Sequence, residues 1–404
     1  MISKLWIENV RSLVSRELEF SPGINVVGGP NGCGKTSVLE SIHLLSQGFS
    51  FRAHDLKEKI AWNGDELILR GNFEEAARSV TRAIRVGRRV CDVRENGETL
   101  RSPAALFGNL PAVVMQPSDI ELLRGAPDVR RRWLDEILCF RSAANATTLR
   151  NYRRILQQRN QWLRQFKREG IATGGEELFI VLTEQLADLG AKLWAARIGL
   201  SKEISPIITD YYRKLSSGVD EITCAYKSSI LKELDALDGA EFLDDSELDT
   251  LASASVGSAD GITSDSGEAS DGTVDENALR EAYRRKLAGL EYAEKIQGIT
   301  LSGPHKDDLG VCIGDVEMRS SGSQGQCRSA AIAMRFAAVD VASRYLNKPI
   351  LLLDDVFAEL DVNRRDAVAS LIREKQCQVV IATPEPKELP FEADGIINLG
   401  GYSD

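Results

Sequence analysis

The feature that most constrains this chain is a phosphate-binding loop near its start whose complement lies near its end. The loop fits the pattern G-x-x-x-x-G-K-[ST] with the residues Gly29-Pro30-Asn31-Gly32-Cys33-Gly34-Lys35-Thr36. The turn Ser323-Gln324-Gly325-Gln326 and an apolar run that ends in Asp354-Asp355 follow only in the last quarter of the 404 residues. Two halves of a nucleotide site separated in this way predict a head built from both ends of the chain, with other residues inserted between them.

The N-terminal loop supplies the chemistry for binding ATP. Its glycines let backbone N–H groups turn toward the phosphates, and the positive end of the following helix adds to the attraction. Lys35 is expected to reach the β- and γ-phosphates and to act in catalysis, and the Thr36 hydroxyl is expected to bind Mg²⁺. A chance glycine turn is the alternative, but a predicted strand precedes the loop and a predicted helix follows it.

The apolar run at residues 350–353 predicts a buried strand, and two carboxylates follow it. Unpaired buried charge is costly, so this pattern needs a reason. In an ATPase, Asp354 would hold the Mg²⁺ shell and Asp355 would be the catalytic group that polarises the attacking water. A strand that ends in a solvated acidic turn is the alternative.

The turn at residues 323–326 precedes a predicted helix at about 327–345. A Ser–Gly–Gln turn at a helix N-terminus is a second device for binding phosphate. Because the N-terminal loop already surrounds one side of the triphosphate, the second device suggests contact with nucleotide on another copy of the chain. A simple helix cap is the alternative.

Composition excludes several functional classes. No run of 18 apolar residues occurs, so no membrane span is expected, and the start of the chain lacks the pattern of a secretory signal. The seven cysteines are scattered without a CxxC pair, which predicts free thiols in a reducing cytosol. With three histidines and no ligand cluster, the sequence indicates no dedicated metal centre.

The net charge of −10 at first argues against a nucleic-acid binder. However, residues 233–276 contain fourteen Asp or Glu and no Lys or Arg, and the remaining chain carries a formal charge of +4. Local patches matter more than the total for binding polyanions. Residues 250–274, rich in Ser, Gly, Asp and Ala, cannot bury enough apolar surface to offset the entropy of ordering, so we expect a disordered acidic loop at about 235–275.

Hydrophobic patterns predict strands near both ends and helices in the middle. The expected strands are residues 4–10, 23–28, 113–115, 311–313, 350–353, 378–381 and 396–399. A helix is expected at 35–45, and a β-rich segment at 66–115 with a hairpin turn at Asn96-Gly97. Residues 128–217 have helical spacing, and glycines between 170 and 175 divide them into an antiparallel helical pair.

The order of these motifs resembles that of ABC-type ATPase heads, and more narrowly that of the RecF family of bacterial recombination mediators. The first resemblance rests on the P-loop, Gln116, residues 323–326, Asp354-Asp355 and Glu359-Leu360-Asp361. The second rests on Asn9-Val10-Arg11, residues 127–135 with Arg130-Arg131-Arg132, residues 152–160, Gly303-Pro304-His305-Lys306-Asp307-Asp308-Leu309 and residues 352–357. It covers nearly the whole chain except about 235–275.

The resemblance implies an α/β fold. An ABC-type ATPase head, with a P-loop sheet and a β-rich subdomain, would be formed by residues 1–125 and 299–404. Residues 126–298 would form a helical, short coiled-coil-like second lobe that includes the acidic loop.

The resemblance also implies a cytoplasmic, slow, DNA-dependent ATPase. Such proteins bind DNA where single and double strands meet, and with RecO and RecR they help to load RecA at gaps, which supports the SOS response. ATP would hold two heads together as a homodimer, with Ser323, Gln324, Gly325 and Gln326 touching the γ-phosphate on the other copy. Asp361 would lie in the D-loop beside the interface, and Gln116 would contact Mg²⁺ and sense the γ-phosphate.

Two positions depart from many ABC heads. Asp355 stands where many heads have Glu, and the shorter acid implies slower hydrolysis, although RecF proteins share it. The switch histidine after the last core strand is absent, and Thr383 is the nearest polar residue.

Two basic clusters could contact the DNA backbone, and a solvated face is the alternative for each. The first comprises Arg82, Arg85, Arg88, Arg89 and Arg94, and the second comprises Arg150, Arg153, Arg154, Arg159, Arg164, Lys167 and Arg168. Arg130 to Arg132 could equally pair with acidic neighbours. Trp162 and Phe166 are expected in the core of the helical pair rather than as base-stacking platforms.

Other functions fit the motifs less well. An SMC- or Rad50-like structural ATPase needs hundreds of heptad residues between the two head halves. A P-loop kinase that phosphorylates a small molecule needs neither the turn at residues 323–326, called here the signature turn, nor a D-loop. A transporter ATPase does not separate its halves with a long helical insert.

Overall fold

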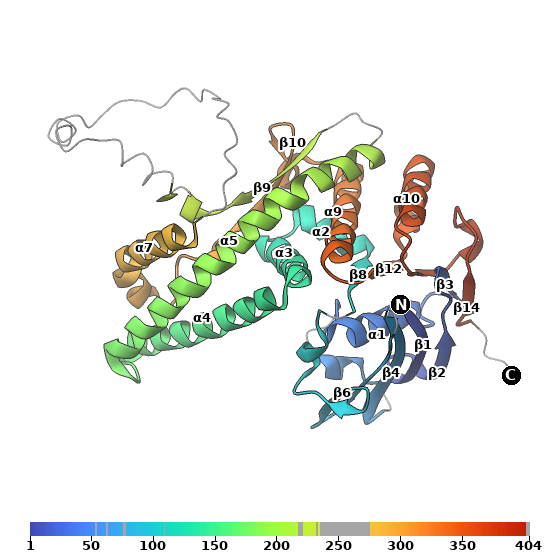
Figure 1. Cartoon of the computed structure of the whole chain (residues 1–404), viewed down its shortest axis with the longest axis horizontal. Helices are drawn as coiled ribbons and strands as arrows, with labels where there is room; N and C mark the ends of the chain where they lie inside the picture. Colours follow the sequence, from blue (N-terminus) through green and yellow to red (C-terminus); the bar gives the residue numbers. More distant parts are fainter. Residues whose placement is uncertain are drawn as a thin grey trace.

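The computed structural model describes residues 1–400 except 53–54, 62–63, 76–77, 109, 217–220, 232 and 235–274. The expected disordered loop at about 235–275 therefore lies almost wholly outside the described residues. The described part of the chain forms a head made from both chain ends and a helical lobe beside it (Figure 1).

A five-stranded parallel sheet brings the two ends of the chain together. Its order is β14-β3-β13-β12-β8, so β3 from the start of the chain lies between two strands from its end (Figure 1). The bounds are β3 Ile24–Gly28, β8 Ala112–Met115, β12 Ile350–Asp354, β13 Val379–Thr383 and β14 Gly395–Asn398. All five strands are among those predicted, and the interleaving confirms that a single head is built from both ends.

An antiparallel sheet forms the second layer of the head. Its order is β2-β1-β4-β5-β6-β7. The bounds are β1 Ile2–Val10, β2 Leu13–Glu19, β4 Glu66–Glu75, β5 Arg78–Gly87, β6 Cys91–Glu95 and β7 Glu98–Thr99. The predicted turn joins β6 to β7, with positive φ at Asn96 and Gly97. The helix α1, Lys35–Gln47, contacts strands of both sheets, so its buried faces hold the two layers together.

The helical lobe contains the predicted antiparallel pair. Trp162 donates to the Gly175 carbonyl and Arg159 donates to Thr183, so the two helices run in opposite directions. A further helix that the sequence patterns did not indicate, α7, packs against both. The bounds are α3 Pro127–Arg141, α4 Ala143–Glu169, α5 Gly175–Leu215 and α7 Glu276–Gln297. Trp162 lies in a small apolar cluster with Leu163, Ala172 and Phe179, and Phe166 packs against it, which confirms their core role.

A third sheet joins the lobe to the head. The order is β11-β10-β9, with β9 Ile222–Lys227, β10 Asp308–Ile313 and β11 Val316–Glu317. The remaining helices follow or flank the head strands. They are α2 Glu121–Arg124, α8 Met318–Ser321, α9 Gln324–Tyr345 and α10 Val362–Glu374, with short 3₁₀ turns η1 Leu56–Lys59, η2 Pro103–Leu106, η3 Pro117–Ile120, η5 Pro304–Lys306, η6 Val356–Glu359 and η7 Pro386–Glu388.

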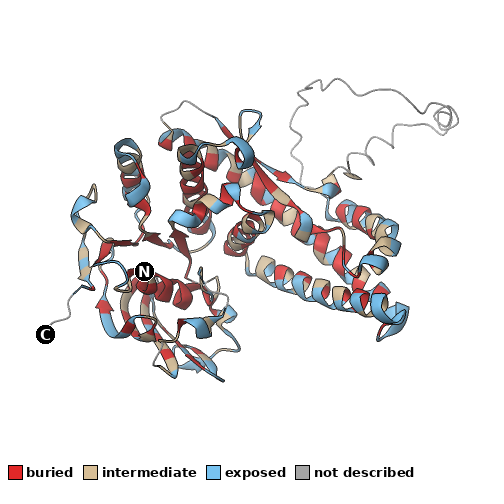
Figure 2. Cartoon of the chain, turned by 180° about the vertical axis from the view of Figure 1, so that it is seen from behind, coloured by how far each residue is buried: buried red, intermediate tan, exposed pale blue. Residues whose placement is uncertain are grey.

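Burial follows this division. One apolar cluster runs from the parallel sheet through α9 and α5 into the lobe, and a second fills the space between α1 and the antiparallel sheet. Figure 2 shows buried residues concentrated in the head sheet, α9 and α5, while much of α4 is exposed. All seven cysteines are free, as predicted.

Candidate nucleotide site

The carboxyl edge of the parallel sheet gathers the residues expected to bind ATP. Thr383 pairs with Gly28, and Asp354 pairs with Ala382. On the other side, Leu353 pairs with Met115, so Gln116 lies beside Asp354 in register. In open α/β sheets, ligands bind outside the carboxyl ends of the strands. The same edge of the sheet, where a ligand would bind, therefore carries the P-loop, Asp354, Gln116 and Thr383.

The P-loop has the backbone that a phosphate cradle needs. Gly29, Gly32 and Gly34 all have positive φ, which L side chains rarely adopt. At Gly34 a Cβ would also lie 2.6 Å from a side-chain carbon of Leu13, so glycine is needed for space as well. The Lys35 ammonium donates to the carbonyls of Gly29 and Pro30 at 2.7 and 2.9 Å, which places it across the mouth of the loop.

One hydrogen bond joins the two halves of the site. The Thr36 hydroxyl donates to the Asp354 carboxylate at 2.8 Å, across 318 positions of sequence. Burial raises the pKa of Asp354, and the Thr36 hydrogen bond and the charge of Arg52 oppose that shift. A hydroxyl and a carboxylate that lie next to each other are oxygen ligands, which Mg²⁺ prefers. Thr36 and Asp354 are therefore suitable ligands for the expected Mg²⁺.

Asp355 has a special backbone. Its φ is 53°, in the left-handed region that is uncommon for residues other than glycine. Its N–H donates to the Ala382 carbonyl at 2.9 Å, so the strained turn is held by the neighbouring strand. Such strain is typical of functional sites. Thr383 lies on that strand, where its hydroxyl accepts from the Glu385 N–H at 3.3 Å.

Gln116 connects the sheet edge to the helix that follows the signature turn. Its N–H donates to Asp119 at 2.9 Å. Asp119 in turn accepts two hydrogen bonds from Arg335 of α9, at 2.7 and 3.1 Å. This buried, bidentate pair is a strong charge-assisted contact. It was not predicted, because nothing in the sequence links positions 119 and 335.

The signature turn lies with the D-loop of the same chain. Ser323 caps α9: its hydroxyl accepts from the Gln326 N–H, and the Gln326 side chain accepts from the Ser323 N–H. Gly325 lies against the Arg364 guanidinium, since an added Cβ would be 3.0 Å from it. Asp361 caps α10 and pairs with Arg364 at 2.7 Å. The contacts described for this turn thus run to the D-loop and within α9, whereas Thr36 of the P-loop contacts Asp354.

Comparison with known proteins agrees with this geometry. The family model described as RecF/RecN/SMC N terminal domain matches residues 1–396. The DNA replication and repair protein RecF of Geobacter metallireducens is 31% identical over 392 residues, covering 96% of this chain and 94% of the relative. That of Geobacter sulfurreducens is 32% identical over 396 residues, covering 97% and 94%. This chain belongs to the RecF family.

Solved structures show the same fold. A structure described as the recombination mediator protein RecF with ATP in the RecFOR pathway has a TM-score of 0.80 at 24% identity, covering 99% of this chain and 98% of that one. An Smc head bound to the C-winged helix domain of ScpA has a TM-score of 0.52 at 16% identity, covering 98% and 93%. The chain thus shares its fold with RecF and, more distantly, with the Smc head. Within the described part, none of the helices combines the length and apolarity that a membrane crossing requires.

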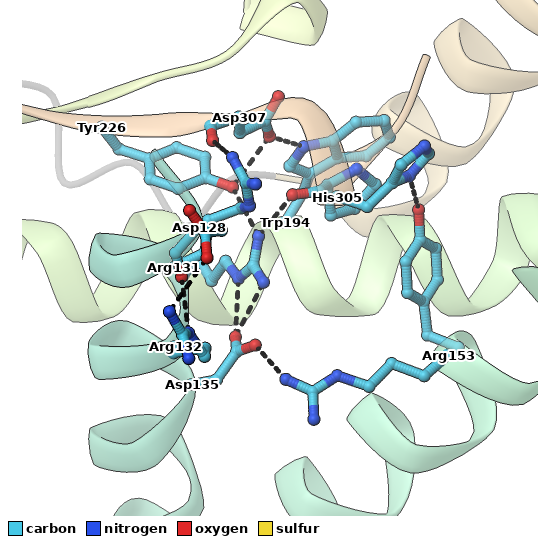
Figure 3. Close-up of polar contacts among 12 residues, drawn as sticks. Asp128, Arg131, Arg132, Asp135, Arg153, Trp194, Tyr226, His305 and Asp307 are labelled. Carbon is cyan, nitrogen blue, oxygen red and sulfur yellow. Dashed lines mark hydrogen bonds and ion pairs between the residues drawn. The ribbon is translucent and has the colours of Figure 1, made fainter. Parts of the chain in front are cut away.

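The Gly303-to-Leu309 motif of this RecF family member forms a polar connection between lobe and head (Figure 3). Arg197 of α5 donates to the Pro304 carbonyl at 2.6 Å and to Asp135 of α3 at 2.7 Å. The Asp307 carboxylate accepts from Trp194 and from Tyr226. Burial raises the pKa of Asp307, against these hydrogen bonds. The motif therefore ties α3, α5 and β9 together.

The structure corrects the prediction that the first basic cluster contacts DNA. It also shows which residues the arginines at 130–132 of α3 pair with. Arg82 is fully buried, where it pairs with Glu95 and donates to carbonyls of α1, so it is not available to DNA. Arg130 pairs with Asp308 at 2.7 Å, and Arg132 pairs with Asp128 at 2.9 Å. The alternative that this run pairs with acidic neighbours holds for both.

Proposed function

We propose that this chain is an ATP-dependent DNA-binding protein of recombinational DNA repair and replication-fork maintenance. The observation that carries the proposal is the Thr36–Asp354 hydrogen bond, which joins two distant segments where the Mg²⁺–nucleotide site is proposed. The turn at Ser323 is exposed and lies against Arg364, which pairs with Asp361 of the D-loop. One half-site for nucleotide and one outward-facing phosphate-binding turn are what two copies need to enclose two ATP molecules.

ATP with Mg²⁺ is the proposed cofactor. Residues 29–36 would bind the phosphates, Thr36, Asp354 and Gln116 would hold the metal, and Asp355 would orient the attacking water. The metal would neutralise charge on the transferring phosphoryl group. Hydrolysis is proposed to be slow and DNA-dependent, and to release the dimer. Residues 323–326 and Asp361 would act across the dimer interface. The division at 1–125, 126–298 and 299–404 belongs to the same proposal.

The names of the relatives support the biological setting. DNA replication and repair proteins of this family match nearly the full chain, and the structural match described above carries RecFOR in its description. We therefore propose that the dimer acts in the cytoplasm at junctions of single-stranded and duplex DNA. Its partners would be RecR together with RecO, its downstream effect would be RecA loading, and its activity would support the SOS response.

An SMC- or Rad50-like structural role fits less well, although the head fold is shared. The longest described helix, α5, has 41 residues and α4 has 27, which make a short arm rather than a long coiled coil. A small-molecule kinase would need neither the turn at residues 323–326 nor the D-loop beside it.

Light scattering tests the dimer. With ATP and Mg²⁺, wild type should shift from monomer to dimer, and Ser323→Arg should stay monomeric while it still binds ATP. Thr173→Arg, which adds the same charge at the tip of the helical pair, is the matched control and should dimerise. Wild type that stays monomeric with ATP bound, or Ser323→Arg that dimerises equally well, would refute the trans site.

Anisotropy tests the DNA partner. Gapped, single-stranded and duplex DNA are compared with and without ATP, and the proposal expects ATP-dependent binding with preference for the gapped substrate. Absence of binding to all three substrates would remove the DNA function while leaving the ATPase assignment standing.

A further inference from the structure

The outward face of α4 carries an uncompensated row of arginines. From Ala143 to Arg168 the helix contains no Asp or Glu, and its first acid is Glu169. At 3.6 residues per turn, six exposed side chains fall within an arc of about 80°. We call this row the α4 stripe: Arg150, Arg154, Gln157, Gln161, Arg164 and Arg168.

The stripe faces solvent along its length. All six residues are exposed, whereas Tyr152, Ile155 and Arg159 on the opposite side are buried. With a rise of 1.5 Å per residue, the distance along the helix from Arg150 to Arg168 is about 27 Å. That length matches about eight base pairs of duplex, whose two strands present a phosphate every 1.7 Å along the axis.

Ion pairing distinguishes the stripe from most other arginines of the helical lobe. Among the described residues, no ion pair is made by Arg150, Arg154 or Arg164, and Arg168 meets only Glu169, at 3.4 Å. On the same lobe, Arg280 pairs with Asp188 across two helices. The neighbouring basic residues of α4 are also engaged: Arg153 reaches Asp135 (Figure 3), Lys167 donates to the Gln297 carbonyl, and Arg159 pairs with Glu294.

The first basic cluster, on the antiparallel sheet, has fewer arginines without an ion pair than the α4 stripe. Arg85 pairs with Glu66, Arg88 with Asp65 and Arg94 with Asp92. With Arg82 buried, Arg89 is the member of that cluster that makes no ion pair within the part of the chain that the structure describes. The stripe is therefore the stronger of the two surfaces for a polyanion.

The row of like charges on the stripe would destabilise a helix that is exposed only to solvent. Arg150 with Arg154, and Arg164 with Arg168, are like charges four positions apart, which destabilise a helix by about 0.2–0.5 kcal/mol per pair. A polyanion that binds the face removes that repulsion. No aromatic side chain lies on the stripe, so stacking on unpaired bases has no platform there, and contact with the phosphate backbone is favoured.

We propose that the α4 stripe is the surface that holds the backbone of double-stranded DNA. This inference rests on the proposed function and specifies where the duplex arm of the junction lies. Arginines bind phosphate and the two glutamines between them add neutral hydrogen-bond donors, so contact would be independent of sequence.

The test is the salt dependence of duplex binding with ATP present. The variant replaces Arg150, Arg154, Arg164 and Arg168 with Gln; its matched control replaces Arg85, Arg88, Arg89 and Arg94 with Gln. Losing four phosphate contacts should reduce the slope of log K against log salt by about 3.6, at 0.9 per contact. Between 50 and 200 mM salt, wild type should then lose about 150-fold more affinity than the stripe variant. The control should keep the wild-type slope.

Several outcomes would overturn the proposal. An unchanged slope in the stripe variant, or an equal drop in the control, places the duplex elsewhere while wild-type binding keeps the proposed function. A loss confined to single-stranded DNA contradicts the duplex assignment. Wild type that binds no DNA at all refutes the proposed function instead. If the fourfold variant fails to fold, Arg150→Gln with Arg154→Gln alone should reduce the slope by about 1.8.

Discussion

The buried pair of Arg159 and Glu294 allows a sharp test of what holds the lobe together. Both side chains are fully buried, and the Arg159 guanidinium donates to Glu294 at 2.7 Å, to Thr300 at 2.8 Å and to Thr183 at 3.0 Å. The second Glu294 oxygen accepts from the Leu301 N–H at 2.7 Å. The pair thus joins α4, α5, α7 and the segment that leads into the Gly303 motif.

Replacing Glu294 with Leu leaves the Arg159 charge buried without a counterion. Removing one partner of a buried pair costs about 3–5 kcal/mol, because desolvation of the remaining charge is no longer offset. The Leu301 N–H also loses its acceptor. By contrast, Arg159→Met combined with Glu294→Leu removes both charges, and such replacements are often neutral or stabilising. The double variant should therefore recover most of the loss, a coupling of about 3 kcal/mol.

Amide hydrogen exchange measures the stability of the lobe in each variant without assuming two-state unfolding of the whole chain. In Glu294→Leu, amides of α4 and α7 should exchange more than about a hundredfold faster than in wild type, since 1.36 kcal/mol is tenfold. Amides of β4 and β5 should not change. A rise of less than about tenfold, or a double variant as fast as the single one, would show that the pair does not stabilise the lobe as argued.

Three further predictions concern the head. Lys35→Met should abolish ATP binding, whereas Asp355→Asn should keep binding and reduce phosphate release by about 10²-fold or more; turnover equal to wild type would exclude Asp355 from catalysis. Burial lowers the pKa of His43 to about 4 from 6.5. The unfolded chain therefore binds more protons between those values, and stability should fall by up to about 3 kcal/mol as pH drops from 6.5 to 4. Denaturant titrations of His43→Leu should lose this contribution and keep that of His305, whose pKa burial also lowers to about 4. Gly48→Ala should destabilise strongly, because the Cβ would lie 1.8 Å from a backbone oxygen of η2 at φ 74°; Gly170→Ala, at φ 71° in open space, should cost only about 1 kcal/mol in thermal unfolding.

The sequence predicted the strands and the helical pair because each has a period that burial imposes. The alternation that marks β5 and the helical spacing of α4 and α5 both survive in the structure. Among the elements of five or more residues, four were missed: β2, β9, α7 and α10, the last of which is capped by Asp361. The strand β2 is mostly exposed, so its pattern is weak. The strand β9 does alternate, with Ile222, Cys224 and Tyr226 buried, and α7 has an Asp275 cap and a Gly298 stop. For these two elements, the sequence does carry signals that could have found them.

The same patterns could have sorted the arginines. Arg82 shares its side of β5 with Ile84 and Val86, both buried, so the two-residue period places it inward. Arg159 lies on the α4 face opposite the stripe, with Tyr152 and Ile155. What no pattern reveals is the identity of the partners. Glu294 and Asp119 lie 135 and 216 positions from Arg159 and Arg335, and only folding brings these pairs together.

The nucleotide edge and the α4 stripe are connected by a hydrogen bond, by ion pairs and by two steps between neighbouring residues of α3 and α4. Gln116 at the edge donates to Asp119, which pairs with Arg335 of α9. Arg335 lies 3.7 Å from Glu136 of α3, a carboxyl whose pKa burial raises.

The preceding residue of α3, Asp135, pairs with both Arg197 of α5 and Arg153 of α4. Arg153 precedes Arg154 of the stripe, so the surface proposed for DNA is anchored to the helix that α9 contacts. The Arg197–Asp135 pair is buried, whereas the Arg153 side chain is 59% exposed. Buried pairs have discrete geometries rather than a continuous range. A change in the position of Gln116 that breaks the Asp119 contact must therefore be taken up by α9 and α3. Under the proposed function, ATP can control DNA binding through this series of contacts without any contact between nucleotide and DNA. Asp119→Asn should therefore weaken the ATP dependence of duplex binding. The α4 stripe itself should stay intact in this variant.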